Sequence, residues 1–292
     1  MRSFHVIVNP AASGGAAATK GEELAQHLRR RGAEVALRRS PSPEAMNGLV
    51  AESVAAGAIC VAAGGDGMVD SAVTPAVRQG ATLAIAPLGR GNDFARQLGI
   101  PTKTDRLVEV LLRGEPSAVD VIDVGRRFVA SSVYAGVDSH VSQIVNRRPW
   151  IPGLLQYPVA AVQGIATFAA RSYRVTIDGK TYDYQGFSVV AANSGYYGKG
   201  MHIAPDADPT DGLLDVVMIA TREGARFTRP RFIAKYPHVY RGTHTKLPEV
   251  TIARGREVTI EADNVEAYAD GERLSALPVT ARVVPGGLSV LR

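Results

Sequence analysis

The stretch Ala58-Ile-Cys-Val-Ala-Ala-Gly-Gly-Asp-Gly-Met-Val-Asp70 predicts the core of an α/β fold. Its first six residues are apolar, small or β-branched, which is typical of a strand buried on both faces. The run stops at Gly64-Gly65-Asp66-Gly67, where a helix is expected to follow. Glycines there let main-chain N–H groups approach a ligand closely, and a helix N-terminus favours phosphate. Asp66 could then hold a divalent cation, although an ordinary Asp-Gly turn would show the same residues.

A second loop of the same kind is Pro87-Leu88-Gly89-Arg90-Gly91-Asn92-Asp93-Phe94. It also follows a short apolar run and opens a helix, whose first turn Asp93 would cap or charge. A third turn, Asn9-Pro10-Ala11-Ala12-Ser13-Gly14-Gly15, ends the first expected strand, and Ser40 ends the second. In a parallel sheet the carboxyl ends of the strands share one edge, so all these residues are expected to lie there.

Strands and helices alternate through the first half of the chain, which predicts a parallel sheet with right-handed crossovers. After residue 113 the pattern changes to short strand-like runs broken by turns, with Asp178-Gly179 as a hairpin signal, and this predicts an antiparallel second domain. We place the domains at 1–123 and 124–292 and leave open a return of the extreme C-terminus to the first domain. The expected strands are 4–8, 34–37, 58–63, 82–86, 128–134, 173–177, 187–192, 214–219, 258–261, 265–269 and 279–284, and the expected helices are 16–31, 43–56, 68–78, one from about 93, 105–113 and 159–169.

The composition limits the partners of this chain of 292 residues, whose net charge is +5. Its basic residues are dispersed, so we expect no nucleic acid partner, whereas an anionic membrane surface fits the charge. The single cysteine, Cys60, excludes an intrachain disulfide and indicates a reducing compartment. The uncharged segment 149–170 is long enough to cross a bilayer, but its prolines and glycines favour a buried helix or one that touches the membrane surface.

Together, the three loops resemble the nucleotide-binding loops of the diacylglycerol kinase family, which includes soluble bacterial diacylglycerol kinases and the sphingosine and ceramide kinases. The resemblance extends over nearly the whole chain. It implies an α/β domain like those of NAD kinase and diacylglycerol kinase, followed by a C-terminal antiparallel β-sandwich. It also implies transfer of the γ-phosphate of ATP, with Mg²⁺, to a lipid hydroxyl, foremost that of diacylglycerol. The nucleotide-binding residues that it implies are Asn9, Pro10, Ser13, Gly14, Ser40, Gly64, Gly65, Asp66, Gly67, Met68, Arg90, Asn92 and Asp93.

Two stretches of the second half also resemble the family. Four aspartates lie between Met201 and Asp215, where turns and hard cations both favour such residues. The resemblance implies a structural magnesium loop with ligands from Asp208, Asp211 and the carbonyl of Leu213. It also implies that Asp270, in Asp270-Gly271-Glu272, is the general base that deprotonates the lipid hydroxyl.

Two departures from the family bear on activity. Met68 and Arg90 stand where the family usually has threonine or serine; methionine cannot donate a hydrogen bond to phosphate, whereas arginine can. We expect an active, cytoplasmic enzyme that binds the membrane surface transiently, and leave a homodimer open. An NAD kinase, which shares the Gly-Gly-Asp-Gly loop, and a non-catalytic nucleotide- or lipid-binding relative remain alternatives. No Gly-x-x-x-x-Gly-Lys-Ser/Thr, Gly-x-Ser-x-Gly or His-Glu-x-x-His motif occurs to anchor other enzyme classes.

Overall fold

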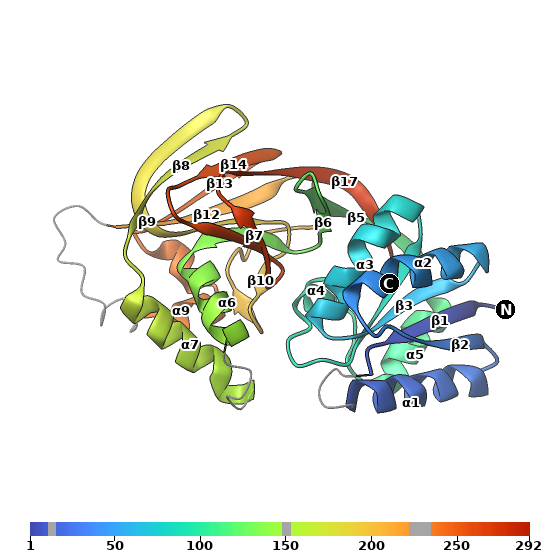
Figure 1. Ribbon diagram of the computed structural model, residues 1–292. Helices are drawn as coiled ribbons and strands as arrows, with labels where there is room; N and C mark the ends of the chain where they lie inside the picture. The colour runs from blue at the N-terminus through green and yellow to red at the C-terminus, as the bar shows by residue number, and fades with distance from the viewer. Residues whose placement is uncertain (11–15, 148–152, 222–234) are drawn as a thin grey trace. The chain divides into compact units, whose positions relative to one another are not determined.

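The computed structural model describes residues 1–10, 16–147, 153–221 and 235–292, and it contains two compact units (Figure 1). The first unit comprises Met1–Val121, Arg127–Ala130 and Val284–Arg292. The second unit comprises Ile122–Arg126 and Ser131–Val283. The chain therefore passes between the units four times, and the C-terminal segment belongs to the first unit.

The first unit is built on a parallel sheet with helices on both faces. Figure 1 shows α1 and α5 on one face and α2 and α3 on the other. The strands in spatial order are β2 (Glu34–Arg39), β1 (Ser3–Val8), β3 (Ile59–Gly64), β4 (Thr82–Pro87) and the C-terminal part of β17 (Val279–Leu291), followed by β5 (Pro116–Asp123) and β6 (Phe128–Val129). The helices are α1 (Ala16–Arg30), the 3₁₀ turn η2 (Pro43–Ala45), α2 (Met46–Ala55), α3 (Asp66–Gln79), α4 (Asp93–Gln97) and α5 (Thr104–Arg113).

The central strand β3 is buried as its sequence predicts. Val61, Ala62 and Ala63 have no exposed surface, because β1 and β4 flank the strand and helices cover both faces. Burial raises the pKa of the Cys60 thiol to about 12, so this cysteine is a core residue and not a nucleophile.

The second unit is an antiparallel sandwich whose two sheets are joined by the long strand β9 (Lys180–Ala192). Its first part pairs with β8 (Arg171–Ile177), and its second part pairs with β7 (Ser132–Gly136) and β12 (Leu214–Ala220). The outer strands are β14 (Glu257–Glu261) and the first part of β17 beside β8, β15 (Glu266–Ala269) and β16 (Glu272–Ala276) beside β7, and β13 (Val250–Gly255) beside β12. The predicted fold class, parallel α/β followed by an antiparallel sandwich, is confirmed.

Helices cover one end of this sandwich. Helix α6 (Val137–Arg147) packs on α7 (Gly153–Thr167). The side chain of Val141 lies against the backbone of α7 at Gly164, where an added Cβ would be 2.5 Å from Cγ2 of Val141. No described helix is long and apolar enough to cross a membrane. The remaining short elements are β10 (Tyr196–Tyr197), β11 (Met201–His202), α9 (Pro237–Tyr240) and the 3₁₀ turn η3 (Thr243–Lys246).

Several predicted elements differ from those observed. The strand expected at 128–134 is divided into β6 and β7, because the chain changes units between Ala130 and Ser131. Helix α3 begins at Asp66 and not at Met68, and α7 ends at Thr167, before the predicted residue 169. The sequence analysis missed α6, β5, β13 and β16, whose apolar residues do not form the long periodic runs that identify an element from sequence. The hairpin at Asp178-Gly179 is confirmed, with φ angles of 46° and 83°.

Candidate active site

The loops singled out in the first half lie at the carboxyl edge of the parallel sheet. Val8 of β1 is in register with both Arg39 and Ala63, and Gly64 is in register with Pro87. The loops that follow β1, β2, β3 and β4 therefore start side by side. Asn9, Pro10 and Ser40 are described there, and the Ser40 hydroxyl donates to the carbonyl of Ser42 at 2.8 Å. Ser13 and Gly14 lie outside the described residues.

Two glycines bring the loops after β3 and β4 into direct contact. The N–H groups of Leu88 and Gly89 both donate to the carbonyl of Gly64, at 2.9 and 3.2 Å. A Cβ on Gly89 would lie 2.3 Å from Cα of Gly65, closer than any real side chain can approach backbone. The sequence analysis assigned these glycines to a ligand, and the structure shows that the loops also need them to reach each other.

Asp66 holds the two loops together. Its Oδ1 accepts the N–H of Asp93 at 2.6 Å and its Oδ2 accepts the N–H of Asn92 at 2.9 Å, which satisfies two donors at the start of α4. The side-chain amide of Asn92 in turn accepts from the N–H of Gly89 and donates to its carbonyl. Both carboxylate oxygens of Asp66 thus have protein partners, and its contact with a cation stays a prediction.

Three other predicted nucleotide contacts differ in their surroundings. Met68 is 8% exposed and lies over Gly64, where an added Cβ would come within 2.8 Å of the Met68 Cβ. Its N–H donates to the carbonyl of Gly65 at 3.0 Å, so Met68 packs the core and has no free donor for phosphate. Arg90 is exposed. Asp93 lies in the first turn of α4, as expected, and pairs with Arg96 at 3.2 Å.

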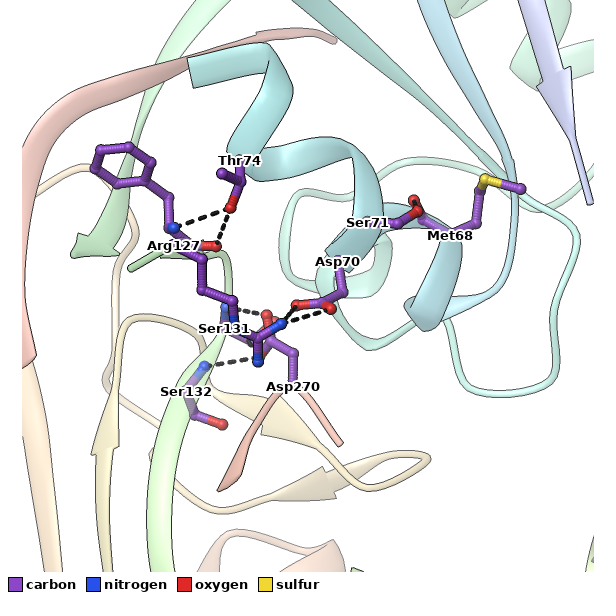
Figure 2. A network of polar contacts seen from close by, with 9 residues as sticks. Met68, Asp70, Ser71, Thr74, Arg127, Ser131, Ser132 and Asp270 are labelled. Carbon is purple, nitrogen blue, oxygen red and sulfur yellow. Dashed lines mark hydrogen bonds and ion pairs between the residues drawn. The ribbon is translucent and has the colours of Figure 1, made fainter. Parts of the chain in front are cut away.

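Helix α3 carries a polar face that the sequence analysis missed (Figure 2). Arg127 donates from Nη1 to both carboxylate oxygens of Asp70, at 3.1 and 2.9 Å. The hydroxyl of Thr74 donates to the carbonyl of Phe128 at 3.1 Å and accepts its N–H at 3.0 Å. Asp66, Asp70 and Thr74 recur every four residues, a spacing that places them on one face of a helix and that could have revealed this anchor.

Asp270 occupies the tight turn between β15 and β16. Its φ of 48° and the 96° of Gly271 lie in the left-handed region, which aspartate and glycine tolerate. Its carboxylate accepts the N–H of Ser131 on both oxygens, at 3.2 and 3.1 Å, and the N–H of Ser132 on Oδ1 at 2.9 Å (Figure 2). The main-chain N–H groups of Ser131 and of Ser132, the first residue of β7, therefore fix the orientation of this carboxylate within the second unit.

The acidic stretch of the second half forms the loop between β11 and β12. Asp208 accepts the N–H and the hydroxyl of Thr210 on Oδ1, at 3.0 and 2.7 Å. Asp211 accepts the N–H of Leu213 on Oδ1 at 3.0 Å. The three predicted magnesium ligands thus belong to one hydrogen-bonded loop.

Comparison with known proteins identifies the family. Residues 3–124 match the diacylglycerol kinase catalytic domain, and residues 131–292 match the YegS C-terminal NAD kinase beta sandwich-like domain. The diacylglycerol kinase of Mycobacterium tuberculosis is 30% identical over 98% of this chain and 94% of the relative. The chain belongs to the diacylglycerol kinase family. It is therefore a kinase, as the sequence analysis expected.

Matches of lower sequence identity are consistent with this family membership. The diacylglycerol kinase of Staphylococcus saprophyticus is 22% identical over 75% of this kinase and 72% of the relative. A solved diacylglycerol kinase structure from Bacillus anthracis superposes with a TM-score of 0.72 at 18% identity, over 99% of this chain and 96% of the other. An NAD kinase of Archaeoglobus fulgidus, solved in complex with ATP, gives a TM-score of 0.50 at 13% identity, over 99% and 92%. These structures show the fold that the two enzyme types share.

The buried carboxyl of Asp138 is connected through tyrosine side chains to the strand that precedes Asp270. Asp138 accepts the hydroxyl of Tyr197 on Oδ1 at 2.6 Å and the hydroxyl of Ser188 on Oδ2. Tyr134 contacts Tyr197 edge-on, with 5.5 Å between the ring centroids. It also stacks on Tyr268, two residues before Asp270, with 6.2 Å between the centroids. Burial raises the pKa of Asp138, and its two hydroxyl partners oppose this.

Asp138→Asn is expected to change how stability depends on pH. Because the pKa of Asp138 is higher in the folded than in the unfolded protein, the folded protein binds the proton more tightly and loses stability as the pH rises above the ordinary aspartate value of 3.8. Asparagine does not titrate, so the variant should lack this loss. Urea midpoints from acid to neutral pH, compared with those of Asp263→Asn at an exposed turn, measure it. Parallel pH profiles for wild type and Asp138→Asn would contradict the assignment.

Proposed function

We propose that this kinase transfers the γ-phosphate of ATP to the free hydroxyl of a membrane lipid, diacylglycerol being the acceptor and phosphatidic acid the product. The observation that carries the proposal is the pair of glycine loops that Asp66 joins at the carboxyl edge of the sheet, directly before the N-terminus of α3. This is the position at which α/β sheets bind ligands, and helix N-termini favour phosphate. The relatives named diacylglycerol kinase support the lipid acceptor.

The two loops would hold the triphosphate mainly through main-chain N–H groups. The side chain of Met68 is buried and has no hydroxyl, so the hydrogen bond that the family threonine would supply is missing. The main-chain N–H of Met68 is already bonded to the carbonyl of Gly65. Arg90, exposed in the second loop, can compensate with charge-assisted hydrogen bonds. When bound, Mg²⁺ would neutralise phosphate oxygens. The ion pair of Asp70 with Arg127 would hold the segment Arg127–Ala130 against α3.

Asp270 would accept the proton of the lipid hydroxyl. Three main-chain hydrogen bonds orient its carboxylate. A carboxylate held in one orientation can act on a substrate hydroxyl as a base. A lipid acceptor requires binding at a membrane surface. We place the kinase in the cytoplasm, in transient contact with an anionic membrane, and the exposed Val159 and Val162 of α7 supply an apolar face for it.

This function is tested by measuring the transfer of labelled γ-phosphate from ATP in the presence of Mg²⁺. Diacylglycerol, monoacylglycerol, sphingosine and phosphatidylinositol are offered separately in mixed micelles, and NAD is offered in solution. We expect label in diacylglycerol and loss of that label in Asp270→Asn. Label in NAD alone would identify an NAD kinase, with which the fold is shared. No label in any tube, from protein that binds ATP, would identify a non-catalytic relative.

Gly67→Ala is expected to weaken ATP binding without harming the fold. Among the described residues, a Cβ at this position would have no atom within 4 Å apart from its chain neighbours and the backbone of its own helix. Alanine in the first turn of α3 is a better helix former than glycine by up to about 1 kcal/mol. The added methyl group would instead meet a phosphate held against the loop. Calorimetric titration with ATP should show a Kd raised by about tenfold or more, equal to about 1.4 kcal/mol. Unchanged ATP affinity would place the phosphates elsewhere.

A further inference from the structure

One guanidinium joins the acidic loop of the second unit to the sandwich. Arg254 lies on β13 directly opposite Asp215 on β12, in an antiparallel pair. Its Nε donates to Oδ2 of Asp215 at 3.2 Å, and its Nη2 forms a short contact with Oδ2 of Asp211 in the loop. Arg254 thus links the last residues of the loop to the strand that follows them.

The local charges explain why a cation is needed here. The side chain of Asp215 is only 4% exposed, and a buried carboxylate is costly unless it is paired. Arg254 pairs with Asp215 and also with Asp211, a second negative charge only four residues earlier in the chain. The guanidinium is therefore the positive charge that lets these aspartates lie together.

Both carboxylates that the family resemblance assigns to Mg²⁺ already accept hydrogen bonds from the protein. Oδ1 of Asp208 accepts two hydrogen bonds from Thr210, and Oδ1 of Asp211 accepts the N–H of Leu213. Oδ2 of Asp211 faces the positive charge of Arg254, which repels a metal ion. Within the part of the chain that the structure describes, no group of three or more acidic, histidine or cysteine side chains could hold a metal ion. Because the guanidinium of Arg254 already occupies Oδ2 of Asp211, this donor set does not fit a structural divalent cation.

We propose that Arg254 takes the place of a metal ion in this loop, fixing Asp211 and Asp215 as an internal counter-ion, so that the loop is stable without Mg²⁺. The inference concerns the stability of the second unit. It holds whichever acceptor the kinase phosphorylates and leaves the Mg²⁺ that accompanies ATP untouched.

Thermal unfolding of the full chain without nucleotide or lipid provides the test. After passage over a chelating resin, wild type should keep its Tm, and millimolar Mg²⁺ should not raise it. Arg254→Gln should lower Tm by several degrees, because Asp215 is left buried without its partner. Mg²⁺ should then recover part of this loss in a saturable way, because Asp211 and Asp215 have lost the cation that pairs with both of them.

Arg174→Gln is the matched control. Arg174 also lies opposite an aspartate in an antiparallel pair, Asp183, but both side chains are more than 60% exposed. Exposed ion pairs contribute little to stability, so the Tm of this variant should be close to that of wild type and should not change with Mg²⁺. If Arg254→Gln is no less stable than Arg174→Gln, the proposal is wrong.

The wild-type protein alone can also overturn the proposal. A Tm that rises saturably with Mg²⁺, or one equivalent of Mg²⁺ retained through the chelating resin and measured by mass spectrometry, would show that the loop binds metal despite Arg254. Asp211→Asn covers the case in which Arg254→Gln does not fold, because it removes the loop contact and keeps the buried pair with Asp215. The Tm of Asp211→Asn should fall by less than the several degrees expected for Arg254→Gln, and Mg²⁺ should not change it. Stabilisation of this variant by Mg²⁺ would contradict the proposal.

Discussion

Asp270→Asn is expected to lower kcat by about 10²–10⁴-fold, the range that a positioned general base contributes. Asparagine tolerates the left-handed backbone at this turn, where φ is 48°, so the hairpin should keep its shape. Its amide cannot take a proton from the acceptor hydroxyl, and so the chemical step should fail while ATP still binds. Steady-state transfer of labelled phosphate to diacylglycerol, with calorimetric ATP binding on the same protein, measures both quantities.

The chain contains a close structural match for this experiment. Asp178 occupies the other Asp-Gly hairpin turn, with φ of 46°, and its carboxylate also accepts three main-chain hydrogen bonds, from the N–H groups of Arg256 and Glu257 at 2.9–3.0 Å. Asp178→Asn therefore makes the same chemical change, carboxylate to amide, at a turn to which the family resemblance gives no role. Its kcat should stay near that of wild type. An equal loss in both variants would show that the turn acts through stability and would exclude Asp270 as the base.

This pair of hairpins also shows where inference from sequence ends. Both Asp-Gly turns were readable from sequence, because glycine and aspartate in the left-handed region identify a hairpin. The local geometry of Asp270 and Asp178 is nearly the same, so neither turn reveals by itself which aspartate is catalytic. That assignment rests on the family resemblance, and the kinetic comparison tests it.

The fold was predictable where the signal is local. Buried β3, the glycine loops and the start of α4 at Asp93 follow from runs of neighbouring residues. Contacts between distant residues were not predictable, because spacing along the chain does not say which partner a carboxylate finds. The sequence suggested a cation as the partner of Asp66, which stays a prediction, but it did not reveal that this carboxylate accepts the N–H groups of Asn92 and Asp93. The link from Asp211 to Arg254 likewise spans 43 residues.

Gly89→Ala is expected to separate the two phosphate loops. Its Cβ would lie 2.3 Å from Cα of Gly65 and 3.0 Å from the N of the same residue, and backbone cannot turn aside as a side chain can. The loss of stability should reach the upper end of the roughly 1–3 kcal/mol that overpacking costs. If the loops part by about 1 Å, the hydrogen bonds to Gly64 and Asp66 lengthen, and kcat/KM for ATP should fall by about 10²-fold. Urea unfolding and kinetics with varied ATP measure the two effects.

Gly67→Ala controls for the added methyl group in the same pair of loops. In the part of the chain that the structure describes, its Cβ meets no atom within 4 Å beyond its chain neighbours and its own helix, so its folding stability should stay at or above that of wild type. The two variants thus separate the roles that glycine has here: Gly89 is needed because backbone meets backbone, whereas Gly67 is needed only if a phosphate approaches. If Gly89→Ala unfolds like wild type, the loops do not touch as described. If Gly89→Ala loses stability and Gly67→Ala loses only ATP affinity, the two loops pack against each other and also bind phosphate.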